Sequence, residues 1–204
     1  MTPAPSVIYL ASASPRRQAL LEQAGVRFQV LLANPGEDVE HLEHVRDGEA
    51  PRAYVERVAL AKALAGQARR ADRSLPAAPV LAADTTVAVG GAILAKPRDP
   101  DDAVRMLSLL SGRTHRVLTA VALVRGAGQI ERCITVSRVT FARLTKARIE
   151  RYVATGEPLD KAGAYAIQGG AAEFVRRIEG SYTGIVGLPL YETLRLLRGT
   201  GRDL

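Results

Sequence analysis

Apolar residues recur along this chain with two periods, one typical of helices and the other typical of strands. Between Asp99 and Gly112 they return every three or four residues, which places them on one face of a helix. Asp99 is a suitable cap for this helix, Pro100 suits its first position and Gly112 suits its end. The short apolar run from Val7 to Ala11 predicts a buried strand instead.

The same criteria predict elements along most of the chain. Further helices are predicted over 15–24, from Pro51 to about 68, over 145–154 and from Pro189 onwards. Strands are predicted over 28–32, 80–83, 116–124, 129–141 and 173–178, with a hairpin over 87–95 that turns at Gly90 and Gly91. Loops are predicted over 34–50, 69–79 and 163–170, and a turn over 126–128.

This mixture of helices and long strands predicts the fold class. We expect an α/β (mixed α+β) protein with a twisted mixed sheet and flanking helices. The simple alternation of strand and helix that builds a doubly wound fold is absent from the sequence. A chain of 204 residues is long enough for one sizeable domain or for two small lobes.

Composition narrows the setting in which the protein works. Hydrophobic residues make up 47% of the chain, yet no apolar run approaches the roughly 20 residues of a membrane helix. Met1 to Ser6 lacks the cationic start of a secretion signal. Cys133 is the single cysteine, which excludes an intrachain disulfide and fits a reducing compartment. We therefore expect a cytoplasmic protein that has no membrane partner.

The charge balance favours an anionic ligand. The net charge is +7, but the basic residues are dispersed, and six Tyr, three Phe and no Trp offer few rings for stacking bases. Nucleic acid binding is therefore a weak alternative. Arginine supplies 24 of the 28 basic residues, so the four lysines stand out as candidates for positions that need a compact ammonium group.

Ser12-Ala13-Ser14-Pro15-Arg16-Arg17 is the strongest candidate for a phosphate site. A predicted strand leads here into a helix start, where exposed amides, hydroxyl groups and guanidinium groups converge. Two cations in the first turn oppose the helix dipole, which favours a bound anion as compensation. The structural alternative is an ordinary helix capped by Ser14.

Asp84 is the leading candidate for catalysis. It follows the small apolar residues of the strand predicted to end at Ala83, where a carboxylate can hold a divalent cation or orient a water molecule. An aspartate that merely ends a strand is an equally good reading of this position alone. Glu37 could add a metal oxygen, and Lys96 lies just ahead of a helix start. In the glycine-rich loop, the amide of Gln168 can recognise the edge of a base.

These segments resemble one known family in order and spacing. The matching motifs are Leu-Ala-Ser-Ala-Ser-Pro-Arg-Arg at 10–17, Ala-Asp-Thr-Thr at 83–86, Lys-Pro-Arg-Asp at 96–99, Asp-Lys-Ala-Gly-Ala-Tyr-Ala-Ile-Gln-Gly at 160–169 and Val-Gly-Leu-Pro at 186–189. They resemble the Maf family of nucleotide pyrophosphatases from about Tyr9 to Leu197. The resemblance implies one domain over 1–204, with two lobes flanking a cleft as in the inosine triphosphate pyrophosphatases, and a possible homodimer.

The resemblance also implies a reaction and a set of residues. The reaction is hydrolysis of a nucleoside triphosphate to the monophosphate and diphosphate, assisted by a divalent metal such as Mg²⁺ or Mn²⁺. Asp84 matches the family's proton acceptor and contributes to metal binding, and Glu37 matches the loop glutamate near the metal. The family's phosphate-binding positions fall on Ser12, Arg17, Lys62 and Lys96.

The family divides by the base of the nucleotide. Arg16, Thr85 and Gln168 resemble the branch that acts on dTTP and UTP, and modified pyrimidine nucleotides are a possible target. The branch that acts on 7-methylguanosine triphosphate carries tryptophan, glutamine and glutamate instead, and this chain has no tryptophan. Hydrolysis of 7-methylguanosine triphosphate and a nucleotide-binding role in the regulation of septum formation are the alternative functions.

Overall fold

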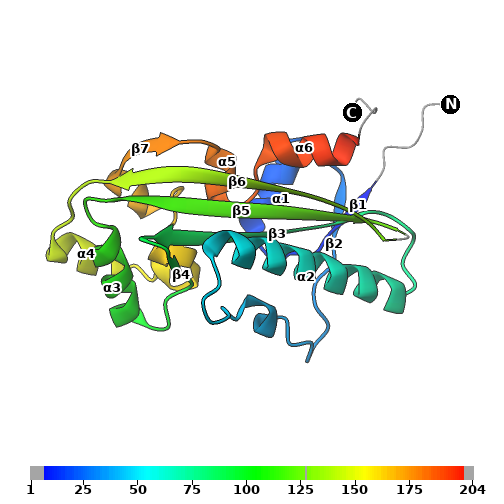
Figure 1. The fold of residues 1–204 in the computed structure, drawn as a ribbon, viewed down its shortest axis with the longest axis horizontal. Helices are drawn as coiled ribbons and strands as arrows, with labels where there is room; N and C mark the ends of the chain where they lie inside the picture. Colours follow the sequence, from blue (N-terminus) through cyan, green and yellow to red (C-terminus); the bar gives the residue numbers. More distant parts are fainter. Residues whose placement is uncertain (1–6, 127, 200–204) are drawn as a thin grey trace.

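In the computed structural model, which describes residues 7–126 and 128–199, a mixed seven-stranded sheet forms the centre of the molecule (Figure 1). The strands are β1 (Ile8–Leu10), β2 (Phe28–Val30), β3 (Val80–Val89), β4 (Ala92–Leu94), β5 (Thr114–Arg125), β6 (Gln129–Phe141) and β7 (Val175–Glu179). Their order is β2-β1-β3-β5-β6-β7, and β4 pairs with β3. β1 is parallel to β2 and β3, whereas the other pairs are antiparallel. The predicted mixed α/β class is confirmed.

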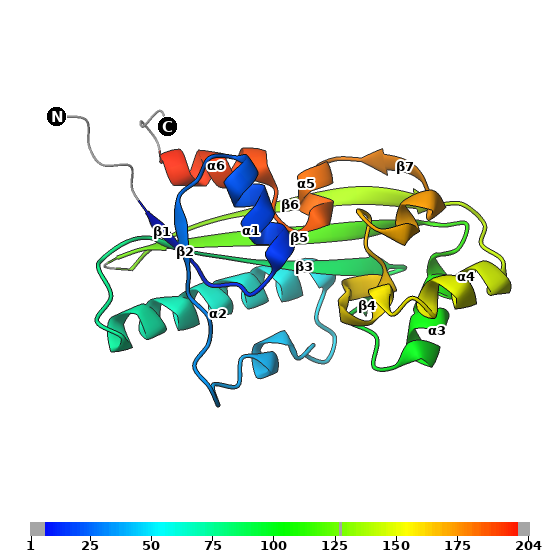
Figure 2. The ribbon, with the colours of Figure 1, turned by 180° about the vertical axis from the view of Figure 1, so that it is seen from behind.

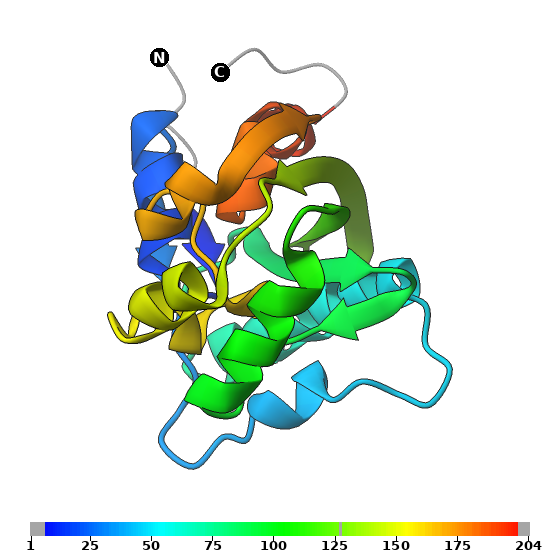
Figure 3. The ribbon, with the colours of Figure 1, turned by 90° about the vertical axis from the view of Figure 1, so that its left-hand side faces the viewer.

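Helices flank this sheet on both faces. They are α1 (Pro15–Gln23), α2 (Pro51–Asp72), α3 (Pro100–Leu110), α4 (Lys146–Val153), α5 (Tyr182–Val186) and α6 (Leu190–Arg198). The long helix α2 lies across one face, while α1, α5 and α6 lie on the other (Figure 2). α3 and α4 lie together at one end of the sheet (Figure 3). Within the described residues, every helix is too short or too polar to span a lipid bilayer.

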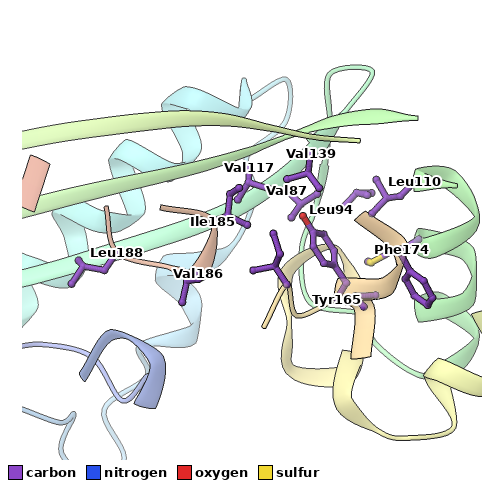
Figure 4. Packing of buried hydrophobic residues seen from close by; sticks show 14 of the residues in the cluster. Val87, Leu94, Leu110, Val117, Val139, Tyr165, Phe174, Ile185, Val186 and Leu188 are labelled. Atoms are coloured by element: carbon purple, nitrogen blue, oxygen red, sulfur yellow. The ribbon is translucent and has the colours of Figure 1, made fainter. Parts of the chain in front are cut away.

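Side chains of β3 contribute alternately to two hydrophobic cores. Ala82 and Ala88 pack on the face covered by α2. Leu81 and Val87 project to the opposite face, where they join a larger core that includes Ile185 of α5 (Figure 4). This alternation follows from the two-residue period of a strand. Neighbouring residues of β3 therefore reach opposite sides of the sheet.

β3 is longer than its sequence indicates. The strand predicted over 80–83 does not end there, because β3 pairs with β5 without interruption from Val80 to Ala88. The hairpin turn at Gly90 and Gly91 is confirmed, but its first strand is the second half of β3. Asp84 therefore lies inside a continuous strand and does not terminate one. The β-branched threonines at 85 and 86 are compatible with this extension.

The boundaries of the other helices and strands differ less from the prediction. α2 continues to Asp72, past the predicted loop start at 69, and Arg69 within it is buried. The short helix α5 was not predicted, and neither were the 3-10 turns η1 (Glu40–Glu43), η2 (Glu157–Asp160), η3 (Ala162–Ala164) and η4 (Gly170–Phe174). η4 occupies the start of the strand predicted from 173. Of the predicted turn over 126–128, position 127 lies outside the described residues, as does the segment from Met1 to Ser6.

One edge of β3 is open in its middle. On the edge opposite β5, this strand pairs with β1 at Val80 and Leu81 and with β4 from Val87 to Val89. No described strand pairs with residues 82–86 on that edge. The gap exposes side chains from both faces of β3 to one space, and Asp84 lies at its centre.

Candidate active site

A cavity of about 540 Å³ occupies this gap in the sheet. Its walls come from the β1–α1 connection, from α2, from the middle of β3 and from the loop that follows η2. Among the residues that line it are eight of the predicted site residues: Ser12, Arg16, Arg17, Lys62, Asp84, Thr85, Lys96 and Gln168. The fold thus brings together residues that are as many as 156 positions apart in the sequence (168 minus 12).

Asp84 belongs to a group of four charged residues that we call the ion-pair cluster: Glu43, Lys62, Asp84 and Lys96. The Lys62 ammonium lies 2.7 Å from Asp84 Oδ1 and 2.6 Å from Glu43 Oε1. Lys96 Nζ lies 3.2 Å from Glu43 Oε2. Two cations that suit phosphate binding are therefore held by two carboxylates, which a polyphosphate would have to replace as partners.

Burial changes the protonation of this cluster. Asp84 is 6% exposed, and its burial raises the pKa of the carboxyl group above the ordinary value, against the opposing charges of Lys62 and Arg17. Burial acts in the same direction on Glu43, but Lys62 and Lys96 outweigh it and lower the pKa of Glu43. A carboxylate with a raised pKa beside a cation is a suitable proton acceptor.

Arg17 is held on the opposite face of β3 by neutral groups. Its Nε donates to the Gly187 carbonyl at 2.9 Å, and Nη1 donates to Ser12 Oγ at 3.2 Å. Nη2 lies 3.4 Å from Thr85 Oγ1. Ser14 occupies the N-cap position of α1, but its side chain makes no capping hydrogen bond; its backbone N–H donates to Ser12 Oγ instead. The guanidinium group is therefore fixed in direction and keeps its charge for a ligand.

Arg16 and Gln168 lie together at one end of the cavity. Both line a smaller hollow of about 280 Å³ that shares residues with the main cavity, whereas Thr85 lines the main cavity alone. Two of the three predicted specificity residues thus face a space beyond the ion-pair cluster. That arrangement suits a ligand with a charged chain at one end and a base at the other.

The loop that carries Gln168 is held in place by hydrogen bonds to Tyr152 and Glu157. Tyr152 donates its hydroxyl proton to Glu157 and accepts the backbone N–H of Ala166, while Glu157 accepts the N–H of Gly170. A side chain at position 169 would collide with the Glu157 carboxylate. The absence of a side chain at Gly169 therefore allows the Glu157 carboxylate to lie against the backbone.

Glu37 is bound elsewhere. Its carboxylate pairs with Arg69, with Nη2 to Oε1 at 2.5 Å, and does not line the cavity. The hydrogen bonds from Arg69 lower the pKa of Glu37 to about 2. Arg57 makes a similar pair with Glu49 and also donates to the carbonyls of Leu42 and His44. These contacts fasten the 34–50 loop, and with it Glu43, against α2.

Sequence reasoning missed four charged residues that line the cavity: Glu43, Arg69, Asp160 and Lys161. Glu43 gives no local signal, because it is one of several acids in a polar loop. Lys161 also lines the cavity, so three of the four lysines do so. The scarcity of lysine in this arginine-rich chain was the available signal for Lys161. The fourth, Lys146, pairs with Glu150 on α4.

The cavity offers oxygen ligands that suit a divalent metal. Among the described residues there is no group of three or more acidic, histidine or cysteine side chains that could hold an ion unaided. Mg²⁺ ordinarily binds through one or two carboxylates together with water and substrate phosphates. The carboxylates of Asp84 and Glu43, which share Lys62, meet that requirement.

Fold and site together define an α/β protein that presents cations to a polyanionic ligand next to a buried carboxylate. Residues 7–200 match the family model described as Maf-like protein, and the chain belongs to this family.

Two similar relatives carry the same functional name. A dTTP/UTP pyrophosphatase of Cupriavidus metallidurans is 60% identical over 96% of this chain and 98% of its own length. A dTTP/UTP pyrophosphatase of Burkholderia pseudomallei is 57% identical over 94% of this chain and 92% of its own. The match to each therefore covers the fold and the cavity.

Solved structures resemble this chain more distantly. A nucleoside-triphosphatase/dITP/XTP pyrophosphatase of Mycobacterium abscessus aligns with 68% of this chain and 75% of its own, at 23% identity and a TM-score of 0.40. A HAM1 protein of Coxiella burnetii aligns with 68% and 74%, at 15% identity and a TM-score of 0.45.

Proposed function

We propose that this protein is a pyrophosphatase that hydrolyses dTTP and UTP to the monophosphate and diphosphate. The observation that carries the proposal is the buried Asp84 carboxylate, paired with Lys62 in a cavity that Arg17 and Lys96 also line. Relatives 57–60% identical over nearly their whole length bear the same name, which supports this choice of substrate.

Positioning and charge neutralisation account for the reaction. Arg17, Lys62 and Lys96 bind the phosphate chain, with Ser12 as a further hydrogen-bonding group. Asp84 accepts a proton from a water molecule whose oxygen forms a bond to the α-phosphorus. The bond from that phosphorus to the bridging oxygen breaks, and pyrophosphate leaves with the electron pair. The preorganised cations stabilise the charge that develops on the leaving group.

A divalent cation, Mg²⁺ or Mn²⁺, completes the site in this proposal. It would neutralise phosphate oxygens during the displacement. Asp84 would be one of its ligands. Glu43 is better placed than Glu37 as the second carboxylate, because Glu43 lines the cavity and shares Lys62 with Asp84. Glu37 would first have to leave the buried Arg69.

Arg16, Thr85 and Gln168 select the base. The amide of Gln168 can donate and accept at once, as recognition of a neutral pyrimidine edge requires. A glutamate at that position would suit a cationic purine, and this chain offers no glutamate or tryptophan there. Modified pyrimidine nucleotides that keep this edge are equally acceptable to such a site.

A substrate panel tests the function directly. Pyrophosphate release should be measured with dTTP, UTP, CTP and 7-methylguanosine triphosphate, with Mg²⁺, with Mn²⁺ and with a chelator. We expect release to require the metal and dTTP and UTP to give the highest kcat/KM. Preference for 7-methylguanosine triphosphate would contradict the roles of Arg16, Thr85 and Gln168, and nucleotide binding without turnover would favour a regulatory role.

Three further features belong to the same proposal. The chain forms one domain with two lobes around the cavity, works as a homodimer and resides in the cytoplasm. A single cysteine, half-buried on β6, is compatible with that reducing compartment. Light scattering at several protein concentrations measures the oligomeric state.

A further inference from the structure

Three threonines lie side by side across the sheet, next to Arg17. Thr85 of β3 is in register with Thr119 of β5, and Thr119 is in register with Thr135 of β6. Residues opposite one another on neighbouring strands project to the same face. Here that face is covered by α5, whose Gly184 lies close to both Thr119 and Thr135.

The hydrogen bonds of this row have a fixed direction. Thr119 is completely buried, and its hydroxyl donates to the Gly184 carbonyl at 2.7 Å. Its oxygen also lies 2.9 Å from Thr85 Oγ1. A hydroxyl has one proton and a carbonyl can only accept, so Thr85 must be the donor to Thr119. The oxygen of Thr85 is then left as the acceptor for Nη2 of Arg17 at 3.4 Å.

A single chain of hydrogen bonds therefore runs from Arg17 through Thr85 and Thr119 to the Gly184 carbonyl. We propose that Thr119, which does not line the cavity, is a positioning residue for the phosphate site. It turns the hydroxyl proton of Thr85 away from Arg17, so that Thr85 presents lone pairs to the guanidinium group and to the cavity. The inference rests on the proposed function, in which Arg17 binds the triphosphate.

Arg17 is buried, so each hydrogen-bond acceptor near its guanidinium group helps to stabilise the charge. Burial lowers the pKa of Arg17, which means that its charge is poorly solvated and depends on nearby oxygens. Gly187 and Ser12 supply two of these oxygens, and the hydrogen-bond chain supplies the third. Loss of the Thr119 hydroxyl would release the Thr85 proton to point toward the cation.

Thr135 provides a matched control. It lies in the same row of threonines, but its buried hydroxyl oxygen makes no hydrogen bond within the described part of the chain. Replacing either threonine by valine removes one hydroxyl and preserves the shape of the side chain. Thr135→Val should therefore leave the site intact and should not lower the unfolding temperature, because an unsatisfied buried hydroxyl is removed.

The experiment compares Thr119→Val, Thr119→Ser and Thr135→Val. Steady-state kinetics with dTTP give KM and kcat, and calorimetry gives the Kd for inorganic pyrophosphate, a ligand without a base. In Thr119→Val we expect KM and that Kd to rise by about 3- to 10-fold with kcat within about twofold, the scale of one hydrogen bond. Thr119→Ser, which keeps the hydroxyl, should return both to wild-type values.

Each other outcome contradicts the positioning role. Wild-type pyrophosphate affinity in Thr119→Val would overturn it, as would an equal loss in Thr135→Val, a failure of serine to restore binding, or a loss confined to kcat. Should Thr119→Val not fold, Thr85→Val breaks the same chain nearer the cavity and must weaken pyrophosphate binding equally. If the wild-type protein hydrolyses no nucleotide, the proposed function fails, while the pyrophosphate measurements still test Thr119.

Discussion

The two faces of β3 hold the cavity's polar groups by different means. On the α2 side, the ion-pair cluster joins carboxylates to lysines at 2.6–3.2 Å. On the α1 side, Arg17 is held by hydroxyl and carbonyl oxygens, and the hydrogen-bond chain continues into the interior at Thr119. The α2 side consists of ion pairs that a charged ligand can rearrange. The α1 side consists of hydrogen bonds between neutral groups and Arg17, and the donor and acceptor of each bond are fixed.

We expect the two faces of β3 to serve different purposes, proton transfer on the α2 side and binding of phosphate on the α1 side. For its proposed role as proton acceptor, Asp84 needs a pKa that its surroundings can change, and burial provides that, opposed by the charges of Lys62 and Arg17. For its proposed role as a phosphate ligand, Arg17 needs a constant position, which buried neutral hydrogen bonds maintain. Substitution of Asp84 on the α2 side should therefore alter turnover first, and substitutions around Arg17 on the α1 side should alter binding first.

The largest expected effect is that of Asp84→Asn. Removing the proton acceptor should reduce kcat for dTTP by about 10²- to 10⁴-fold, the usual contribution of general base catalysis. Pyrophosphate release measures this, with the unfolding temperature as the control for folding. Near wild-type turnover in Asp84→Asn would eliminate the assignment and would also erase the distinction between the two faces of β3.

The next effect distinguishes Glu43 from Glu37. Glu43→Gln should weaken activation by Mg²⁺ by about 10- to 100-fold, the scale reported for groups that tune a metal site. Glu37→Gln should leave the metal titration unchanged and lower stability by about 1–3 kcal/mol, because the buried Arg69 loses its partner. Metal titrations of kcat and thermal unfolding of both variants measure this. The reverse pattern would restore Glu37 as the metal ligand.

The smallest expected effect is a loss of folding stability at low pH. Glu37 and Glu49 each have a pKa of about 2 because of hydrogen bonds from arginine, below their ordinary 4.5. A lowered folded-state pKa gives stability that is present above pH 4.5 and is lost as the pH falls toward 2. Each ion pair should contribute about 1 kcal/mol to the free energy of unfolding, which corresponds to about 2–4 °C in the unfolding temperature.

Thermal unfolding of wild type, Glu37→Gln and Glu49→Gln between pH 6 and pH 2 checks this. Each variant should start lower at pH 6 and lose less than wild type on acidification. Because both pairs fasten the 34–50 loop, the α2 side of the cavity should open in acid before the hydrogen-bond chain is affected. Parallel curves for all three proteins would show that these pairs do not anchor the loop.

The sequence was sufficient for features whose signal is local. Asp99, Pro100 and Gly112 mark the ends of α3, and the Asp99 side chain does accept a hydrogen bond from the Asp102 N–H. The motifs at 12–17 and 83–86 likewise identified residues that the fold brings into one cavity.

Features that depend on distant partners were beyond the sequence. The length of β3 depends on its pairing with β5, and 24 residues separate the end of β3 from the start of β5. Glu43 and Glu37 occupy the same polar loop, and their partners differ because Lys62 and Arg69 meet them from positions about two turns apart on α2. The proposed positioning role of Thr119 depends on the register between β3 and β5, which no sequence motif reveals.

The open edge of β3 has a consequence for how such a protein changes during evolution. Asp84 and Thr85 are neighbours in the chain, yet they leave the strand on opposite faces and line the same cavity. If Thr85 selects the base, as we propose, a mutation at position 85 would alter which nucleotide is accepted while the acid beside it keeps its surroundings. Descendants of one ancestral gene can therefore exchange substrates and inherit the reaction unchanged.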